Sequence, residues 1–155
     1  MATMVGTQRD LLSLLNQLLE LDYDAIEAYK AAIERIHDDT DKARLTSFMR
    51  DHEQHVRDLS DIIIAKGEPP APGPDLKRVL TKGKVILGAI AGDRTILIAM
   101  KMNENDTNTA HERAVARSDL DPNLRALVER SLNDERRHRA WLSQRLEVLN
   151  TAAHP

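Results

Sequence analysis

Two stretches of the sequence repeat each other: residues 51–60 read DHEQHVRDLS, and residues 134–143 read DERRHRAWLS. At an offset of 83 residues, the first aspartate, the second histidine, the leucine and the serine of the first stretch recur in the second. Each stretch has two ionisable residues three positions apart, His52/His55 and Glu135/His138, and this spacing places them on one face of a helix. The two stretches therefore predict two equivalent helices with polar side chains on a common face.

The repeat extends backward along the chain, because an offset of 82 residues aligns the segments that precede the two stretches. This offset matches Leu15, Asp24, Ala28, Ala32 and Arg35 to Leu97, Asp106, Ala110, Ala114 and Arg117. A nearly constant offset over such a length indicates a duplicated structural unit. We interpret the sequence as an internal duplication of one helical hairpin.

Apolar residues recur every three or four positions in four long segments, as in amphipathic helices that face a core. We predict helices over residues 8–37, 41–66, 93–117 and 122–149. The segment GEPPAPGPD at 67–75 contains four of the six prolines and ends the second helical pattern. A crossover is expected over 67–92, with one short helix around Leu76 to Leu80. The predicted fold is an all-α four-helix bundle of two antiparallel hairpins joined by this crossover.

The composition is that of an ordinary globular protein, with 155 residues, 30% charged residues and a formal net charge of −3. This length fits a single domain over residues 1–155. Without a basic excess, nucleic acid and anionic membrane surfaces are not expected as partners. The most apolar segment, 85–100, is interrupted by Asp93 and Arg94 and is shorter than the ~20 residues of a membrane helix. Because the N-terminus also lacks the basic region of a secretion signal, we expect a cytoplasmic protein.

Ionisable residues interrupt the apolar stripes of all four predicted helices: Asp22, His52, His55, Glu104, Glu135 and His138. Counted from the turn of each hairpin, they lie at one height, so the bundle should bring them together in its middle. Burying such groups is costly unless they pair with one another or bind a cation. The chain has no cysteine, so nitrogen and oxygen would be the ligands, as suits iron, zinc or manganese. These six residues are the predicted metal ligands.

The sequence resembles the ferritin-like superfamily, in which two helices each supply a Glu and the other two each supply a Glu-x-x-His. Residues 135–138 read E-R-R-H and match the second element, and Glu104 matches the first. Tyr29 follows Asp22 by seven residues, which is the spacing of a tyrosine in rubrerythrin-related members. The likeness to uncharacterised bacterial ferritin-like proteins of similar length covers residues 8–149, in segments such as LDYDAIEAYKAAIER, DHEQHVRDL and MNENDTNTAHERAV.

The resemblance implies an up-down-down-up bundle with a metal centre in its core. It also implies a homodimer, since ferritin-like bundles often associate. Iron in such a centre would react with oxygen or peroxide, in an oxidase or metal-handling role with an unidentified redox partner. Asp22 stands where the family has Glu, and His52 stands where it has a Glu that bridges two metals. The cysteine site of full rubrerythrins is absent from the sequence.

The residue pattern leaves alternatives open. The six residues could hold two ions, or two histidines with one or two carboxylates could hold a single iron, zinc or manganese ion. Without metal, the same groups could close into a hydrogen-bond network in a structural, stress-related or interaction protein. Tyr29 and His111, each seven residues after a carboxylate, are expected to orient ligands as outer partners. Lys101, three residues before Glu104, could place an ammonium group near that carboxylate. The pattern identifies no catalytic residue.

Overall fold

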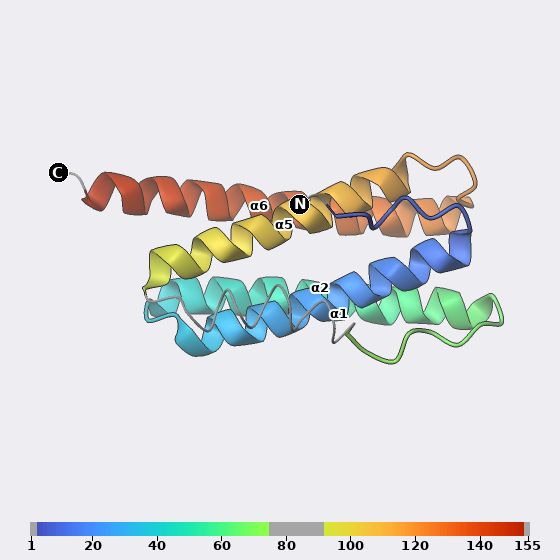
Figure 1. Cartoon of the computed structure of the whole chain (residues 1–155), viewed down its shortest axis with the longest axis horizontal. Coiled ribbons are helices and arrows are strands. Elements are labelled where there is room, and N and C mark those ends of the chain that lie inside the picture. The colour runs from blue at the N-terminus through green and yellow to red at the C-terminus, as the bar shows by residue number, and fades with distance from the viewer. Residues whose placement is uncertain (1–2, 75–91, 154–155) are drawn as a thin grey trace.

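The computed structural model describes residues 3–74 and 92–153, and all regular structure within these ranges is helical. The helices are α1 (Leu11–Arg35), α2 (Asp39–Ala65), α5 (Asp93–Val115) and α6 (Pro122–Ala153). They pack mainly as two pairs, α1 with α2 and α5 with α6. The pairs meet through α1 against α5 and, less closely, α2 against α6 (Figure 1). The all-α four-helix bundle predicted from the sequence is confirmed.

The direction of each helix can be followed in Figure 1. Helices α1 and α6 run one way along the bundle, and α2 and α5 run the opposite way. Both hairpins are therefore antiparallel, in the order up-down-down-up. Helix α2 ends and α5 begins at opposite ends of the bundle. The short helix predicted around Leu76 to Leu80 lies outside the described residues.

Polar caps set the starts of the first two helices. Asp10 accepts a hydrogen bond from the backbone N–H of Ser13 at 2.8 Å, and Asp38 accepts one from Asp41 at 2.9 Å. Such caps satisfy N–H groups that have no partner within the helix. Helix α1 accordingly begins at Leu11 rather than at residue 8. Helix α6 continues past residue 149 to its end at Ala153 and projects beyond the bundle (Figure 1).

Polar contacts join the two hairpins at the end of the bundle where α5 begins. The Asp93 carboxylate accepts hydrogen bonds from the backbone N–H groups of His37 and Asp38, both at 2.9 Å. Arg145 of α6 donates to Asp41 of α2 at 2.7 Å. The turn between α1 and α2 is thus held against the start of α5 and the second half of α6.

The segment before α1 packs on the opposite end of α5. Arg113 donates to the backbone carbonyls of Thr3 and Val5, at 2.7 and 3.0 Å. Gly6 lies close against this helix with φ +92°, and a Cβ atom there would come within 2.7 Å of the Arg113 Cβ. Both the backbone conformation and the close approach require glycine at this position.

A polar layer divides the apolar core into two clusters. One cluster combines the start of α1 with the end of α2, the end of α5 and the start of α6; it includes Leu14, Leu18, Ile63, Ala114, Leu124 and Val128. The other cluster lies at the opposite end; it includes Ile36, Leu45, Phe48, Leu97, Met100 and Leu142. Burial of each large side chain contributes about 1.5–3 kcal/mol. These clusters hold the four helices in register on either side of the polar layer.

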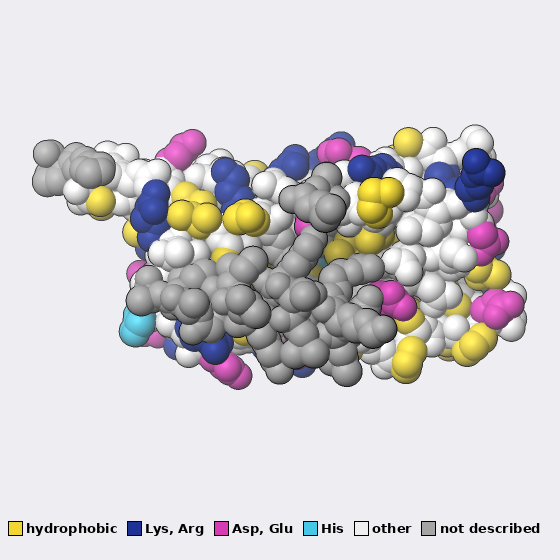
Figure 2. Space-filling model, viewed as in Figure 1, with side chains coloured by type: hydrophobic (Ala, Val, Ile, Leu, Met, Phe, Trp, Pro, Cys, Tyr) yellow, Lys and Arg dark blue, Asp and Glu magenta, His cyan; other side chains and the backbone are white. Residues whose placement is uncertain are grey.

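The surface drawn in Figure 2 carries lysine and arginine side chains interspersed with acidic ones. Four large hydrophobic side chains among the described residues are exposed: Met4, Ile64, Met102 and Val148. Within residues 3–74 and 92–153, no helix is both long enough and apolar enough to span a membrane.

Candidate metal centre

The polar layer contains all eight side chains that the sequence pattern singled out as ligands or outer partners. They are distributed over four helices: Asp22 and Tyr29 on α1, His52 and His55 on α2, Glu104 and His111 on α5, and Glu135 and His138 on α6. All are buried, and the most exposed of them, His55, is only 3% accessible. Each lies on the core-facing stripe of its helix, which directs its side chain into the interior of the bundle.

Seven of these residues form two overlapping groups of donor atoms. In each group, one nitrogen or carboxylate oxygen from each of four residues lies within 4.8 Å of the others. The first group consists of Asp22, His55, His111 and Glu135. The second consists of His52, Glu104, Glu135 and His138. Because Glu135 belongs to both groups, its carboxylate lies between them.

His55 and His138 are oriented in the same way on their two helices. The Nε2 atom of His55 lies 3.1 Å from Oδ2 of Asp134, and that of His138 lies 2.9 Å from Oδ2 of Asp51. An ionised carboxylate can only accept, so Nε2 carries the proton in both rings. A carboxylate on the outer nitrogen is the arrangement that fixes the ring of a metal-binding histidine. It leaves Nδ1 of each ring directed toward the cluster.

His52 lies among three carboxylates from three different helices. Its Nδ1 atom is 2.8 Å from Oδ1 of Asp22 and 3.5 Å from Oε1 of Glu135. Its Nε2 atom is 3.5 Å from Oε1 of Glu104. The same oxygen of Asp22 is also 3.3 Å from Nδ1 of His55. His52 therefore links the first hairpin to both acidic residues of the second.

The Glu104 carboxylate is held from two sides. The hydroxyl of Tyr29 donates a hydrogen bond to Oε1, and the hydroxyl of Thr107 lies 3.2 Å from Oε2. Burial and the Glu104 carboxylate raise the pKa of Tyr29 well above its usual value, so the phenol keeps its proton. The Asn108 amide donates to the backbone carbonyls of Glu104 and Glu135, at 2.7 and 2.9 Å. Tyr29 thus orients a carboxylate of the other hairpin, and Asn108 ties α5 to α6 at this level.

His111 is fixed by its own helix. Its Nδ1 atom lies 2.9 Å from the backbone carbonyl oxygen of Thr107, one turn earlier. A carbonyl oxygen can only accept, so Nδ1 carries a proton, and Nε2 is the ring nitrogen that remains for a metal ion. The sequence pattern suggested an outer partner at this position. The structure places a ring nitrogen of His111 among the donor atoms of the first group.

The charged groups of the cluster shift one another's pKa values. Burial alone would lower the pKa of His52 and His55, but the surrounding carboxylates outweigh it and raise these values to about 10 and about 12. Burial would raise the pKa of Asp22 and Glu104, but the neighbouring histidines outweigh it and lower both. In the absence of a cation, His52 and His55 are therefore protonated beside the ionised carboxylates of Asp22 and Glu104.

Some buried donor atoms have no hydrogen-bond partner within the described part of the chain. In the two donor groups they are Oδ2 of Asp22, Nε2 of His52, Nδ1 of His138 and both carboxylate oxygens of Glu135. A buried polar atom without a partner is costly. Nε2 of His52, Oε1 of Glu135 and Nδ1 of His138 have ion-pair contacts of only 3.4–3.6 Å within the cluster. A cation between the unpartnered atoms would satisfy them. The donor set, which combines imidazole nitrogen with carboxylate oxygen, fits a transition-metal ion.

Asp51 and Asp134 are members of the site that the sequence reasoning did not identify. They are only partly buried, and each precedes its own helix's histidine by four residues. Each contacts the histidine of the other helix: Asp51 of α2 holds His138 of α6, and Asp134 of α6 holds His55 of α2. The hydrogen bond from His55 lowers the pKa of Asp134 to about 2. Arg137 donates to both aspartates, at 2.9 and 2.8 Å. The available signal was the Asp-x-x-x-His spacing common to both repeated stretches.

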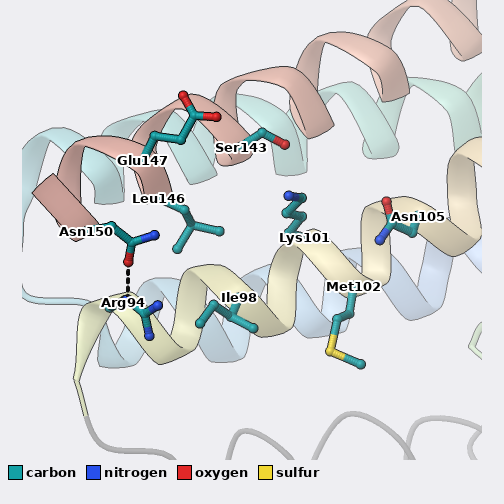
Figure 3. A pocket seen from close by; sticks show the side chains of 9 residues that line it. All are labelled: Arg94, Ile98, Lys101, Met102, Asn105, Ser143, Leu146, Glu147 and Asn150. Atoms are coloured by element: carbon teal, nitrogen blue, oxygen red, sulfur yellow. Dashed lines mark hydrogen bonds between the residues drawn. The ribbon is translucent and has the colours of Figure 1, made fainter.

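Two surface pockets adjoin α6. One, between α2 and α6, is lined by His55, Asp58, Arg130 and Asp134 among others, and so reaches the edge of the cluster. The other lies between α5 and α6 and is drawn in Figure 3. Lys101 lines this second pocket, so its side chain extends into the surface pocket between the two helices instead of into the polar layer.

The fold and the site together define an all-α four-helix bundle with a buried cluster of carboxylates and histidines in its core. The chain belongs to the family described as "Domain of unknown function (DUF2383)", whose model matches residues 10–117. The matched region includes α1, α2 and α5, and it ends before α6, which carries Glu135 and His138. No curated protein and no solved structure matches the sequence.

Proposed function

We propose that this chain is a ferritin-like, rubrerythrin-related protein that binds one or two transition-metal ions in the core of its bundle. Its ligands are Asp22, His52, His55, Glu104, Glu135 and His138. The observation that carries this proposal is the pair of buried donor groups built from all four helices, in which atoms of Asp22, His52, Glu135 and His138 lack hydrogen-bond partners in the described residues. Imidazole and carboxylate ligands suit iron, zinc and manganese.

The likeness to ferritin-like proteins is supported by the arrangement of the ligands as well as by the helix order. Glu104 and the pair Glu135/His138 supply one half of such a centre, and Asp22 with His55 supplies most of the other. His55 and His138 each have a carboxylate on the outer nitrogen, Nε2, so the inner nitrogen, Nδ1, faces the other ligands of the cluster.

The remaining residues position the ligands and exclude water. Tyr29 and Thr107 hold the Glu104 carboxylate, and the apolar clusters close the polar layer along the bundle on both sides. Bound iron would supply reactivity toward oxygen or peroxide, for an oxidase or metal-handling role. The pocket beside His55 and Asp134 offers a route from solvent to the ligands.

Metal analysis of the purified chain tests the proposal directly. The protein is prepared without a histidine tag, supplemented with iron, zinc or manganese, and compared with a Glu135→Ala/His138→Ala variant. We expect stoichiometric metal in the parent chain and none in the variant. The proposal is wrong if the parent chain retains no stoichiometric metal under any of these supplements.

A metal-free interaction or structural protein is the second candidate, because the cluster also pairs its own charges. His52 contacts Asp22, His55 contacts Asp134 and His138 contacts Asp51, all at 3.1 Å or less. A chelator would then leave the melting temperature unchanged. A metal ion present at 100 times its Kd stabilises the native state by about 2.7 kcal/mol, so its removal should lower Tm by roughly 5–10 °C.

A further inference from the structure

We infer that His111 is a direct metal ligand, and that the cluster binds two ions, each through two histidines and two carboxylates, with Glu135 shared between them. This inference rests on the proposed metal-binding function and specifies its site. The first ion takes Asp22, His55, His111 and Glu135. The second takes His52, Glu104, Glu135 and His138.

The position of His111 supports a direct role. Its side chain is 1% exposed, and one of its ring nitrogens lies within 4.8 Å of donor atoms from Asp22, His55 and Glu135. Nδ1 is engaged by the carbonyl of Thr107, so Nε2 is the nitrogen with a lone pair to offer. An outer partner would use its N–H group on another ligand. Here that group is used on the helix backbone, as is common for histidines that bind metal directly.

The orphaned atoms are distributed as two adjacent ions require. Oδ2 is unpartnered in Asp22, a residue of the first donor group, and Nε2 of His52 and Nδ1 of His138 are unpartnered in two residues of the second. Both oxygens of Glu135, the residue common to the two groups, are buried without a hydrogen-bond partner in the described residues. One carboxylate can bind two ions through its two oxygens, whereas a single ion would leave donors of the other group unsatisfied.

Two exchanges between the duplicated halves make the two groups equal in composition. His52 occupies the position that Glu135 occupies in the second half, and His111 occupies the position of Tyr29 in the first. His52 contributes its nitrogen to the second group, and His111 contributes its nitrogen to the first. Each group therefore contains two nitrogen and two oxygen donors. Four such donors suit zinc or another divalent ion of the first transition series. The two groups together then need only the three carboxylates of Asp22, Glu104 and Glu135.

Cobalt titration of the untagged, chelator-treated chain tests this assignment, with Co²⁺ absorption and elemental analysis as readouts. The informative variant is His111→Gln, and the matched control is His37→Gln, whose side chain is 86% exposed in the turn between α1 and α2. We expect two Co²⁺ per chain in the parent and the control, and one in His111→Gln with an altered absorption spectrum.

Two Co²⁺ and an unchanged spectrum in His111→Gln would overturn the inference, as would a single ion in the parent. The last two outcomes leave the proposed metal-binding function standing, whereas a parent that binds no metal overturns both.

A second measurement avoids the risk that His111→Gln fails to fold, which circular dichroism of the metal-free variant would reveal. Ring nitrogen NMR of the unmutated chain compares the metal-free and Zn²⁺-loaded states. If His111 binds the metal directly, its Nε2 resonance should shift strongly when Zn²⁺ is added. Its Nδ1 resonance should keep the chemical shift of a protonated nitrogen. An Nε2 resonance unaffected by Zn²⁺ would overturn the inference.

Discussion

The two copies of the duplicated hairpin meet in the polar layer, where they share one histidine contact and differ in one ionisable residue. In both copies a histidine, His55 or His138, is held through Nε2 by an aspartate of the other copy. The copies differ one turn earlier, where α2 has His52 and α6 has Glu135. Only the second copy contributes a carboxylate to both donor groups. A symmetric scaffold can thus carry an asymmetric cluster, in which Glu135 is the residue that the two donor groups share.

Giving position 52 the glutamate found at the equivalent position of the second copy should have the largest effect on stability. His52→Glu places a fourth carboxylate beside Asp22, Glu104 and Glu135 and removes a protonated partner. We expect the metal-free protein to lose about 3–5 kcal/mol of stability, as when a buried ion pair is broken. Urea unfolding in the presence of a chelator measures this loss, and metal should restore much of it. Gln54→Glu, which adds an exposed carboxylate to the same helix, is the control; equal stability of the two variants would contradict the expectation.

Removing the shared carboxylate should weaken metal binding at both donor groups. We expect Glu135→Ala to weaken binding of each ion by more than about 100-fold, because loss of a ligand exceeds the 10–100-fold effect of losing a ligand's partner. Calorimetric titration with Zn²⁺ measures the affinities, and Glu129→Ala, an exposed position on α6, serves as control. If one ion still binds with the affinity of the parent chain, Glu135 is not shared between the two ions.

The crossed aspartates should have smaller and separable effects. Asp51→Ala frees the outer nitrogen of His138, and Asp134→Ala frees that of His55. We expect each change to lower the affinity of one ion by about 10–100-fold and to leave the other nearly unchanged. The same titrations distinguish the two ions, with Asp61→Ala, at an exposed acidic position on α2, as the control. Equal weakening of both ions by either variant would show that the halves do not act separately.

The pH dependence should differ between the metal-free and metal-bound proteins. Folding raises the pKa of His52 and His55 from 6.5 to about 10 and about 12, so their stabilising contribution is complete below pH 6.5 and is lost as pH rises through the folded values. Folding lowers the pKa of Asp22 below 3.8, so its contribution is lost only as pH falls below that value. The melting temperature of the chelated protein should therefore fall between pH 6.5 and 9, whereas metal binding, which displaces protons, should strengthen.

The smallest change in stability is expected from replacing Arg137, which contacts Asp51 and Asp134 from the surface and is half exposed. Surface ion pairs contribute about 0–1 kcal/mol. Arg137→Ala should therefore change the unfolding free energy by less than about 1 kcal/mol, as measured by urea unfolding. Binding of both ions should persist. A larger loss of stability would indicate that Arg137 holds the two aspartates in place.

The sequence predicted the four helices well because the apolar period of each helix is a local property. It also placed Asp22, His52, His55, Glu104, Glu135 and His138 at one level, since distance from a turn converts directly into height along an antiparallel hairpin. It missed the role of Asp51 and Asp134, because periodicity assigns a side chain to a face of its own helix and leaves the facing residue of the next helix undetermined. His111 was expected beside the ligands for the same reason.

The sequence by itself therefore determined the all-α bundle, the duplication and the height of the polar layer. Only the tertiary structure decided how that layer is connected. In the folded chain, the aspartates of α2 and α6 each contact the histidine of the other helix. Tyr29 contacts Glu104 of the other hairpin, and His111 lies beside Asp22 and His55. These contacts depend on the spacing and rotation of neighbouring helices, which are set by the packing of the two apolar clusters around the layer.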